Sequence, residues 1–273
     1  IKPICGCDLL VAEDDNPDQQ SLLVLLVRNQ QGYRNLVELI SLAYLQGQVR
    51  GSVAVKRSWL SGKTAGLIAL SAAGKGDVGK ALLANDLPLA GQLLAQWQLL
   101  FPDSYYLELQ RTGRAGDSEH VARAVALALA TNTPVVATND VRFLRQEDFE
   151  AHEVRVCINE RRTLDDPRRP RNHSDQQYLR TSAEMQELFS DLPEALENTI
   201  EIAKRCNLSL VLGKPQLPNY PTPVTDGKPM PIEDYFRLLS VEGLEERLVH
   251  LYPDSTKREI ERPRYAERLE FEI

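Results

Sequence analysis

Residues 134–142, P-V-V-A-T-N-D-V-R, decide the fold class of this chain. The short apolar run at 135–137 has no polar alternation, which predicts a strand buried on both faces. Three short polar side chains follow at 138–140. A carboxylate at the C-terminal tip of a parallel strand is where α/β folds place their chemistry, so Asp140 is a candidate site residue. The alternative is a simple turn, which this stretch alone favours, because Asn and Asp bond their own backbone in turns.

Outward from this strand, short apolar runs alternate with helical patterns through the first two-thirds of the chain. The predicted strands are 5–11, 22–27, 67–70, 105–109 and 135–137. The predicted helices are one that follows Gly32, then 78–84, 87–100 and 119–130. Short strands separated by helices of this length predict βαβ units, and hence an α/β fold with a mostly parallel sheet or barrel.

Beyond residue 146 the pattern becomes helical, and a proline-rich segment then interrupts it. Helices are predicted at 148–158, 183–189 and 193–206. Six prolines fall within the 19 residues 213–231, a density that excludes a helix or a central strand and predicts an extended connector. Two charged amphipathic helices, 232–251 and 255–273, follow it.

The composition is that of a globular protein of the cytosol. With 42% hydrophobic and 26% charged residues, the 273-residue chain can bury a sizeable core. Its net charge of −7 argues against a primary DNA-binding surface. No apolar run approaches the roughly 20 residues of a membrane span. Four cysteines make no disulfide framework at this length. The first and last residues suggest a piece of a longer protein.

A metal site is the first chemistry to consider, because Asp8 and Asp140 both lie at predicted strand ends and could converge in a barrel. Cys5 and Cys7 share one face of their strand and fit a core better than a ligand set. Two carboxylates without imidazole would hold Mg²⁺ only weakly. The four histidines show no paired spacing and no C-x-x-C is present, so these residues predict no zinc site.

Other candidates have ordinary structural explanations. His120 is expected at the solvated start of a helix. His152 could be a general base, but a helix-face histidine with acidic neighbours is more often a hydrogen-bonding group. The Gly-rich stretch 73–77 lacks the phosphate-binding motifs and predicts a tight strand-to-helix turn. The arginine-rich run 161–171 predicts an exposed, solvated loop.

Several strings of the sequence, taken together, resemble one family. They are I-K-P-I-C-G-C-D at 1–8, N-x-x-G-Y-x-N-L at 29–36, L-E-L-Q-R-T-G at 107–113, V-V-A-T-N-D at 135–140, A-H-E at 151–153, L-D-D-P-x-R-P-R at 164–171 and I-A-K-R-C-N at 202–207. This set is similar to the N-terminal part of the α subunits of bacterial DNA polymerase III, of the proteobacterial type.

The resemblance implies three parts. Residues 1–213 would form a polymerase-and-histidinol-phosphatase (PHP) domain, a distorted seven-stranded (β/α) barrel whose first strands are missing here. Residues 214–231 would be the proline-rich connector. Residues 232–273 would begin the α-helical lead into the polymerase palm.

The departures from the family pattern concern its metal site. Metal-binding members have Glu where this chain has Asp8, His near Leu22 and Cys near Ala73. They read N-D-x-H where this chain reads N-D-V-R at 139–142. Arg142 cannot ligate a metal and could instead pair with Asp8 or Asp140.

We therefore expect a vestigial, metal-free pocket at Asp8, Asn139, Asp140 and Arg142, with no catalytic or metal-binding residue in this segment. The resemblance implies a scaffold that stabilises the polymerase and docks the proofreading exonuclease subunit. The Mg²⁺ of nucleotidyl transfer and the contacts with DNA and sliding clamp would lie outside the chain. The alternative function is that of an active, metal-dependent PHP phosphoesterase or exonuclease. The expected location of the protein is the cytoplasm.

Overall fold

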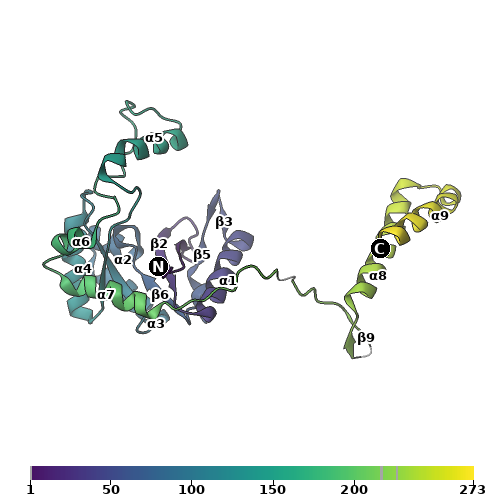
Figure 1. Cartoon of the computed structure of the whole chain (residues 1–273), viewed down its shortest axis with the longest axis horizontal. Coiled ribbons are helices and arrows are strands. Elements are labelled where there is room, and N and C mark those ends of the chain that lie inside the picture. Colours follow the sequence, from purple (N-terminus) through teal and green to yellow (C-terminus); the bar gives the residue numbers. More distant parts are fainter. Residues whose placement is uncertain (1, 216–217, 226) are drawn as a thin grey trace. The chain divides into compact units, whose positions relative to one another are not determined.

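The computed structural model describes residues 2–215, 218–225 and 227–273, and it divides the chain into two compact units (Figure 1). The first unit is Ile1–Leu210 and the second is Val211–Ile273. The predicted connector, 214–231, includes residues 216, 217 and 226, which lie outside the described residues.

A six-stranded sheet forms the centre of the first unit, in the order β5-β1-β2-β6-β7-β8. The strands are β1 (Gly6–Ala12), β2 (Gln20–Val27), β5 (Val55–Lys56), β6 (Leu67–Leu70), β7 (Tyr105–Gln110) and β8 (Val135–Thr138). Strand β2 is antiparallel to both of its neighbours, β1 and β6, whereas the other three pairings are parallel. The α/β class predicted from the sequence is confirmed, with one reversed strand inside a mostly parallel sheet.

The helices of this unit follow the predicted alternation. They are α1 (Gln30–Gln46), α2 (Asp77–Leu83), α3 (Leu87–Leu100), α4 (Asp117–Thr131), α5 (Phe149–Glu160), α6 (Ser182–Leu188) and α7 (Pro193–Arg205). Short elements complete it: β3 (Gln48–Val49), β4 (Ser52–Val53) and the 3₁₀ turns η1 (Arg57–Leu60), η2 (Ala73–Lys75) and η3 (Gln146–Asp148). The sequence did not predict β3, β4 and β5, because two-residue strands carry no periodic signal.

Both faces of β6–β8 are buried, which explains their uninterrupted apolar sequences. Alternate residues of these strands enter the larger core, which they share with α1–α4: Leu67, Ala69, Leu107, Leu109 and Ala137. The intervening residues Ile68, Leu70, Tyr106 and Val136 pack against Ile202 and Cys206 at α7. Helix α7 therefore covers the opposite face of the sheet.

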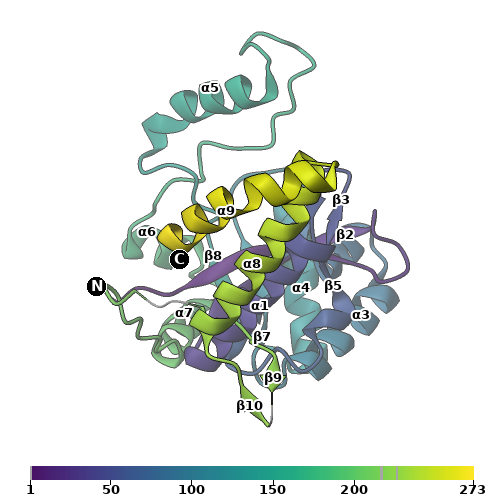
Figure 2. The same cartoon turned by 90° about the vertical axis from the view of Figure 1, so that its right-hand side faces the viewer.

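Helix α5 belongs to an excursion, residues 144–177, that we call the α5 lobe. It extends away from the sheet in two perpendicular views (Figures 1 and 2). Its two ends lie together, because the backbone N–H of Arg142 donates to Gln177 O at 2.8 Å and Phe143 forms a bridge with Tyr178. The chain thus leaves the sheet after β8 and returns to the same place.

The second unit contains the hairpin β9 (Val224–Thr225) and β10 (Lys228–Pro229), then α8 (Ile232–Leu251) and α9 (Ser255–Glu272). Ion pairs join the two helices, between Arg237 and Glu270 at 2.7 Å and between Arg262 and Glu245 at 2.6 Å. Among the residues described, none of the helices combines the length and the apolar character needed to cross a membrane.

Candidate functional site

The carboxyl ends of β6, β7 and β8 meet at one edge of the sheet, and each is followed by a charged side chain. Lys75 ends the 3₁₀ turn η2 after β6, Arg114 lies in the loop after β7, and Asp140 follows β8. Asp140 has a φ of 42°, a left-handed conformation that Asp tolerates better than most residues. This conformation ends the strand and accompanies the turn of the chain into the α5 lobe.

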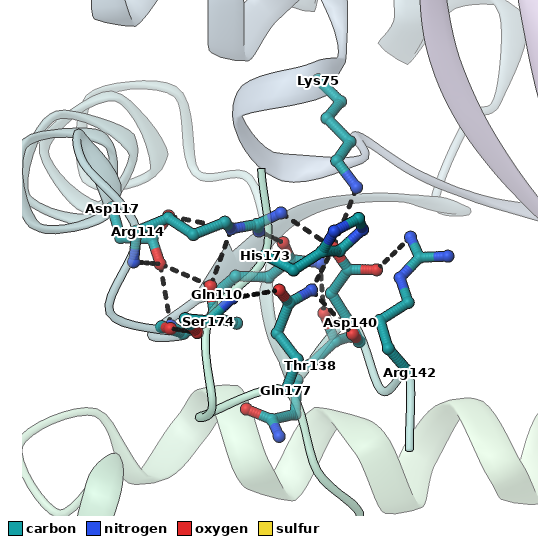
Figure 3. A network of polar contacts seen from close by, with 12 residues as sticks. Lys75, Gln110, Arg114, Asp117, Thr138, Asp140, Arg142, His173, Ser174 and Gln177 are labelled. Atoms are coloured by element: carbon teal, nitrogen blue, oxygen red, sulfur yellow. Dashed lines mark hydrogen bonds and ion pairs between the residues drawn. The ribbon is translucent and has the colours of Figure 1, made fainter. Parts of the chain in front are cut away.

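Asp140 lies inside a cage of cationic side chains (Figure 3). Its Oδ1 accepts a hydrogen bond from Arg142 Nη2 at 2.6 Å. Its Oδ2 accepts from Lys75 Nζ and Arg114 Nη1, both at 2.9 Å, and from Gln177 Nε2 at 3.1 Å. With 11% of its side chain exposed, this carboxylate is nearly buried and accepts hydrogen bonds from four side chains.

Opposing effects act on the pKa of Asp140. Burial alone would raise the pKa, but the hydrogen bond from Lys75 and the charges of Lys75, Arg142 and Arg114 outweigh burial. The pKa of Asp140 therefore lies below its ordinary value, and the residue is ionised at neutral pH.

Arg114 is held in place by its own partners. Its Nη2 donates to Gln110 Oε1 at 2.9 Å, and its Nε donates to Thr112 Oγ1 at 2.8 Å. Asp117, in the first turn of α4, accepts hydrogen bonds from Thr112 Oγ1 and Thr112 N at 2.8 Å. The guanidinium facing Asp140 is consequently held in place by neighbouring side chains.

A pocket of about 310 Å³ opens beside this cage. Strand register explains its lining: Asp8 lies opposite Val24, which lies opposite Leu70, so these side chains share one sheet face. Glu108 and Gln110 continue that face on β7. Leu22, Ala72, Thr138 and Val141 complete the lining, with Lys75, Asp140 and Arg142.

Glu108 is the buried carboxyl group of this pocket. Its Oε1 accepts hydrogen bonds from Thr138 Oγ1 at 2.5 Å and from Gln110 Nε2 at 3.1 Å, whereas its Oε2 has no partner among the described residues. Burial raises the pKa of Glu108, and the charges of Asp8 and Asp140 raise it further, against the two hydrogen bonds. The pocket therefore combines one stabilised carboxylate with one carboxyl group that resists ionisation.

The structure brings together three of the four residues that the sequence indicated. Asp8, Asp140 and Arg142 line the pocket. Of the two partners hypothesised for Arg142, Asp8 and Asp140, the structure pairs it with Asp140. The sequence placed Asp8 at the end of its strand, and this expectation was wrong. Asp8 is the third residue of β1 and lies level with the end of β6, because β1 extends further.

Asn139 has a different place. Its side chain is 7% exposed and donates from Nδ2 to Gln176 O at 3.1 Å and to Tyr178 O at 2.7 Å. It therefore fastens the returning end of the α5 lobe to the end of β8, and it does not line the pocket.

Sequence reasoning missed Lys75, Arg114, Glu108 and Gln177. A usable signal existed for the first two, because each follows a parallel strand just as Asp140 does. The stretch 73–77 was predicted as a tight turn, which the structure confirms, but its lysine was not considered. No local signal marks Gln177, which arrives through the far end of the α5 lobe.

Of two other expectations from the sequence, the one for His120 was wrong, and the one for the run 161–171 holds for most of its residues but not for Arg169. His120 is 4% exposed rather than solvated, and burial lowers its pKa. The run 161–171 is not wholly a solvated loop, because Arg169 has 8% of its side chain exposed and forms an ion pair with Glu153.

Comparison with known proteins shows which proteins this chain is similar to. Residues 1–112 match the PHP domain family. The whole chain is 56% identical over 274 residues to DNA polymerase III subunit alpha of Pseudomonas aeruginosa, and 49% and 47% identical over 273 residues to those of Escherichia coli K12 and Vibrio cholerae. The chain spans 23% of the length of each of these relatives. It is thus a homologue, over its entire length, of a PHP-containing segment of DNA polymerase III α subunits.

Proposed function

We propose that this chain is the N-terminal segment of a replicative DNA polymerase and that its PHP domain is a non-catalytic scaffold. The relatives are subunits of DNA polymerase III, which supports a DNA-directed DNA polymerase for the intact protein. Nucleotidyl transfer with Mg²⁺, DNA binding and clamp binding then belong to regions beyond this segment. The protein would act in the cytoplasm, as part of a multi-subunit assembly.

The proposal that the pocket is inactive rests on the three basic side chains around Asp140. The family pattern implies a metal site here, but the donors of this chain do not suit a cation. A metal ion bound at Asp140 would have to displace Lys75, Arg114 and Arg142 or lie against their charges. Leu22 and Ala72 line the same pocket and offer no ligand atom. The three basic groups supply the positive charge that a metal would bring.

A hydrolytic assay of the full-length protein tests this part of the proposal. With Mn²⁺, Zn²⁺ or Mg²⁺ present, we expect no release of phosphate from phosphomonoesters and no 3′-exonuclease activity beyond that of an Asp8→Asn control. Hydrolysis that disappears on Asp8→Asn substitution would contradict the proposal.

The second part of the proposal is that the PHP domain docks the proofreading exonuclease subunit. It rests on the family resemblance and on the need for a separate editing activity if this pocket is inactive. Cross-linking mass spectrometry of the full-length protein with that subunit should give cross-links to lysines within residues 1–213. Cross-links confined to later parts of the polymerase would refute a docking role.

An active phosphoesterase remains the second candidate function, and two carboxyl groups favour it. Asp8 is exposed at the pocket, and no hydrogen bond to its side chain occurs among the described residues. Glu108 directs an unpartnered oxygen from the same face. Tight binding of two or three metal ions that depends on Asp8 would favour this candidate over the scaffold.

A further inference from the structure

Two histidines and a glutamate from distant parts of the sequence meet in the α5 lobe, outside the Asp140 pocket. His152 and Glu153 belong to α5, and His173 lies in the segment that returns from it. The two imidazole rings lie edge to face, with centroids 4.7 Å apart. One donor atom from each residue lies within 4.8 Å of the others, a separation that a single metal ion can span.

Two of the three donor atoms of this cluster, on His152 and Glu153, are buried without hydrogen-bond partners among the described residues. Glu153 is 5% exposed, and its Oε1 has no partner among the described residues. The Nδ1 atoms of His152 and His173 lie 3.7 and 3.6 Å from that oxygen, too far for hydrogen bonds. His152 is 9% exposed, and its Nδ1 is likewise without a partner. Leaving such groups unsatisfied costs free energy, so the site is incomplete as a purely hydrogen-bonded structure.

Arg169 contacts one carboxylate oxygen of Glu153 and leaves the other one free. Its Nη1 forms an ion pair with Glu153 Oε2, which leaves Oε1 directed at the two histidines. Ligating carboxylates in metal sites are commonly held by a second group in this way. The ion pair restrains the carboxylate, whose free oxygen lies within 3.7 Å of the Nδ1 atoms of both histidines.

We propose that His152, Glu153 and His173 bind one divalent transition-metal ion of the Zn²⁺ type. Zinc bonds of about 2.0–2.1 Å to nitrogen and oxygen place tetrahedral ligands about 3.4 Å apart. The two nitrogen–oxygen separations exceed this value only slightly, so small ring movements would complete three of four positions. Two imidazoles and a carboxylate suit zinc, cobalt or nickel better than Mg²⁺ or Ca²⁺.

The space next to the cluster allows a fourth ligand. A pocket of about 530 Å³ is lined by His152, His173 and Glu160, so water can reach the ion. Glu160 Oε2 is another buried oxygen without a partner in the described chain. Its negative charge, together with that of Glu153, offsets the positive charge of Arg169 beside the ion.

The ion would join α5 to the returning segment of the lobe. Ser174, next to His173, donates a hydrogen bond from Oγ to Thr112 O, and Figure 3 shows His173 beside the Asp140 cage. Metal binding at the cluster would thus stabilise the exit of the lobe, where Gln177 reaches Asp140. The role that follows is structural.

Metal content of the full-length protein tests the site. Protein stripped with a chelator, reloaded with Zn²⁺ and desalted should retain one more equivalent of zinc in wild type than in His173→Asn or Glu153→Gln. Co²⁺ in place of Zn²⁺ should give the visible absorption of a four-coordinate ion, absent in both variants. Loss of an outer partner alone weakens affinity about 10–100-fold, so loss of the His173 ligand should weaken it at least about 100-fold.

Two control variants separate this site from other sources of metal. His250→Asn removes an exposed histidine of α8, and Asp8→Asn alters the other pocket; both should retain the wild-type zinc content. The metal-free melting temperature of His173→Asn should lie close to that of wild type, because the substitution removes no hydrogen bond and only an edge-to-face contact with His152. Zn²⁺ should raise only the wild-type melting temperature. Equal zinc content in wild type and His173→Asn, or no zinc in wild type, would overturn the proposal.

Discussion

The guanidinium of Arg142 donates a hydrogen bond from Nη2 to Oδ1 of Asp140 at 2.6 Å, across only two residues of sequence. The pair differs from an ordinary surface ion pair because the acceptor is nearly buried while 38% of the Arg142 side chain is exposed. Arg142 is therefore the outer member of the cage, whereas Arg114, with 19% of its side chain exposed, is the inner one.

The two arginines should differ in their contribution to stability. Arg142→Leu should lower the free energy of unfolding by no more than about 1 kcal/mol, because solvent screens the exposed partner and Asp140 keeps two other cations. Arg114→Leu should cost about 2 kcal/mol, since it removes the donor to Gln110 Oε1 and leaves part of the Asp140 charge without its partner. Urea denaturation of the 273-residue chain, followed by tryptophan fluorescence, measures both. Equal costs would show that the cage has no inner and outer member.

Restoring one ligand should not restore a metal site in the pocket. Arg142→His creates an imidazole beside Asp140, but Lys75 and Arg114 still bond its Oδ2 and Leu22 and Ala72 still lack donor atoms. Zinc content measured in the His173→Asn background, which removes the cluster in the α5 lobe, should be unchanged by Arg142→His. A gain of one equivalent would mean that Asp140 can leave its cage.

Asp140 should make stability depend on pH in acid. Its pKa is lowered in the folded state, so its contribution is complete above the unfolded value of about 3.9 and is lost as pH falls through the folded value. The destabilisation caused by Asp140→Asn, about 2 kcal/mol at pH 7, should therefore shrink below pH 4. Urea midpoints of both proteins at pH 7, 5 and 3.5 check this. A difference that is constant with pH would contradict the ion pairs.

Glu108 should show the opposite pH dependence. Its pKa is raised in the folded state, so stability falls as the pH rises from the unfolded value of about 4.3 to the folded value and stays lowered above it. Glu108→Gln should therefore become more favourable, relative to wild type, between pH 4 and pH 7. The same urea series measures it, and a variant that loses stability relative to wild type over this interval would show that Glu108 is a stabilised anion.

Two helix glycines should respond oppositely to alanine. A Cβ on Gly32 would lie 1.9 Å from the carbonyl oxygen of Gly66, whereas a Cβ on Gly91 meets nothing within 4 Å. Gly32→Ala should therefore destabilise by about 2 kcal/mol or more, through forced separation of α1 from the turn before β6. Gly91→Ala should stabilise by about 0.5–1 kcal/mol through helix propensity alone. Thermal melting of both variants tests the close approach at Gly32.

Sequence patterns predicted the central elements well because burial dictates their composition. Strand β7, with all six residues buried, was predicted over 105–109 and spans Tyr105–Gln110. Strand β2 alternates between buried and half-buried residues, which identifies a strand but not its direction. Its reversal within the sheet is set by pairing with β1 and β6, which local sequence does not encode.

The site was less predictable, for a related reason. Asp140 and Arg142 are two positions apart in the sequence, which indicated them together, whereas Gln177 reaches Asp140 only after the whole α5 lobe. His152 and His173, 21 positions apart, match no spacing motif because a loop of irregular shape brings them together. Motif reasoning applies to ligands on one helix or turn, and this chain draws its polar clusters from separate segments.

The joined ends of the α5 lobe have a further consequence for how such a chain can vary. Because Arg142 and Gln177 share a backbone hydrogen bond and Leu179 bonds back to Phe143, the intervening residues form a side branch of the main path. Insertions, deletions or wholesale exchange of that branch need not shift any strand of the sheet. The branch nevertheless supplies Gln177 to the Asp140 cage, so a transplanted lobe would bring one hydrogen-bond donor of that cage with it. The sheet can therefore stay unchanged while an exchange of this branch changes a hydrogen-bond donor to Asp140.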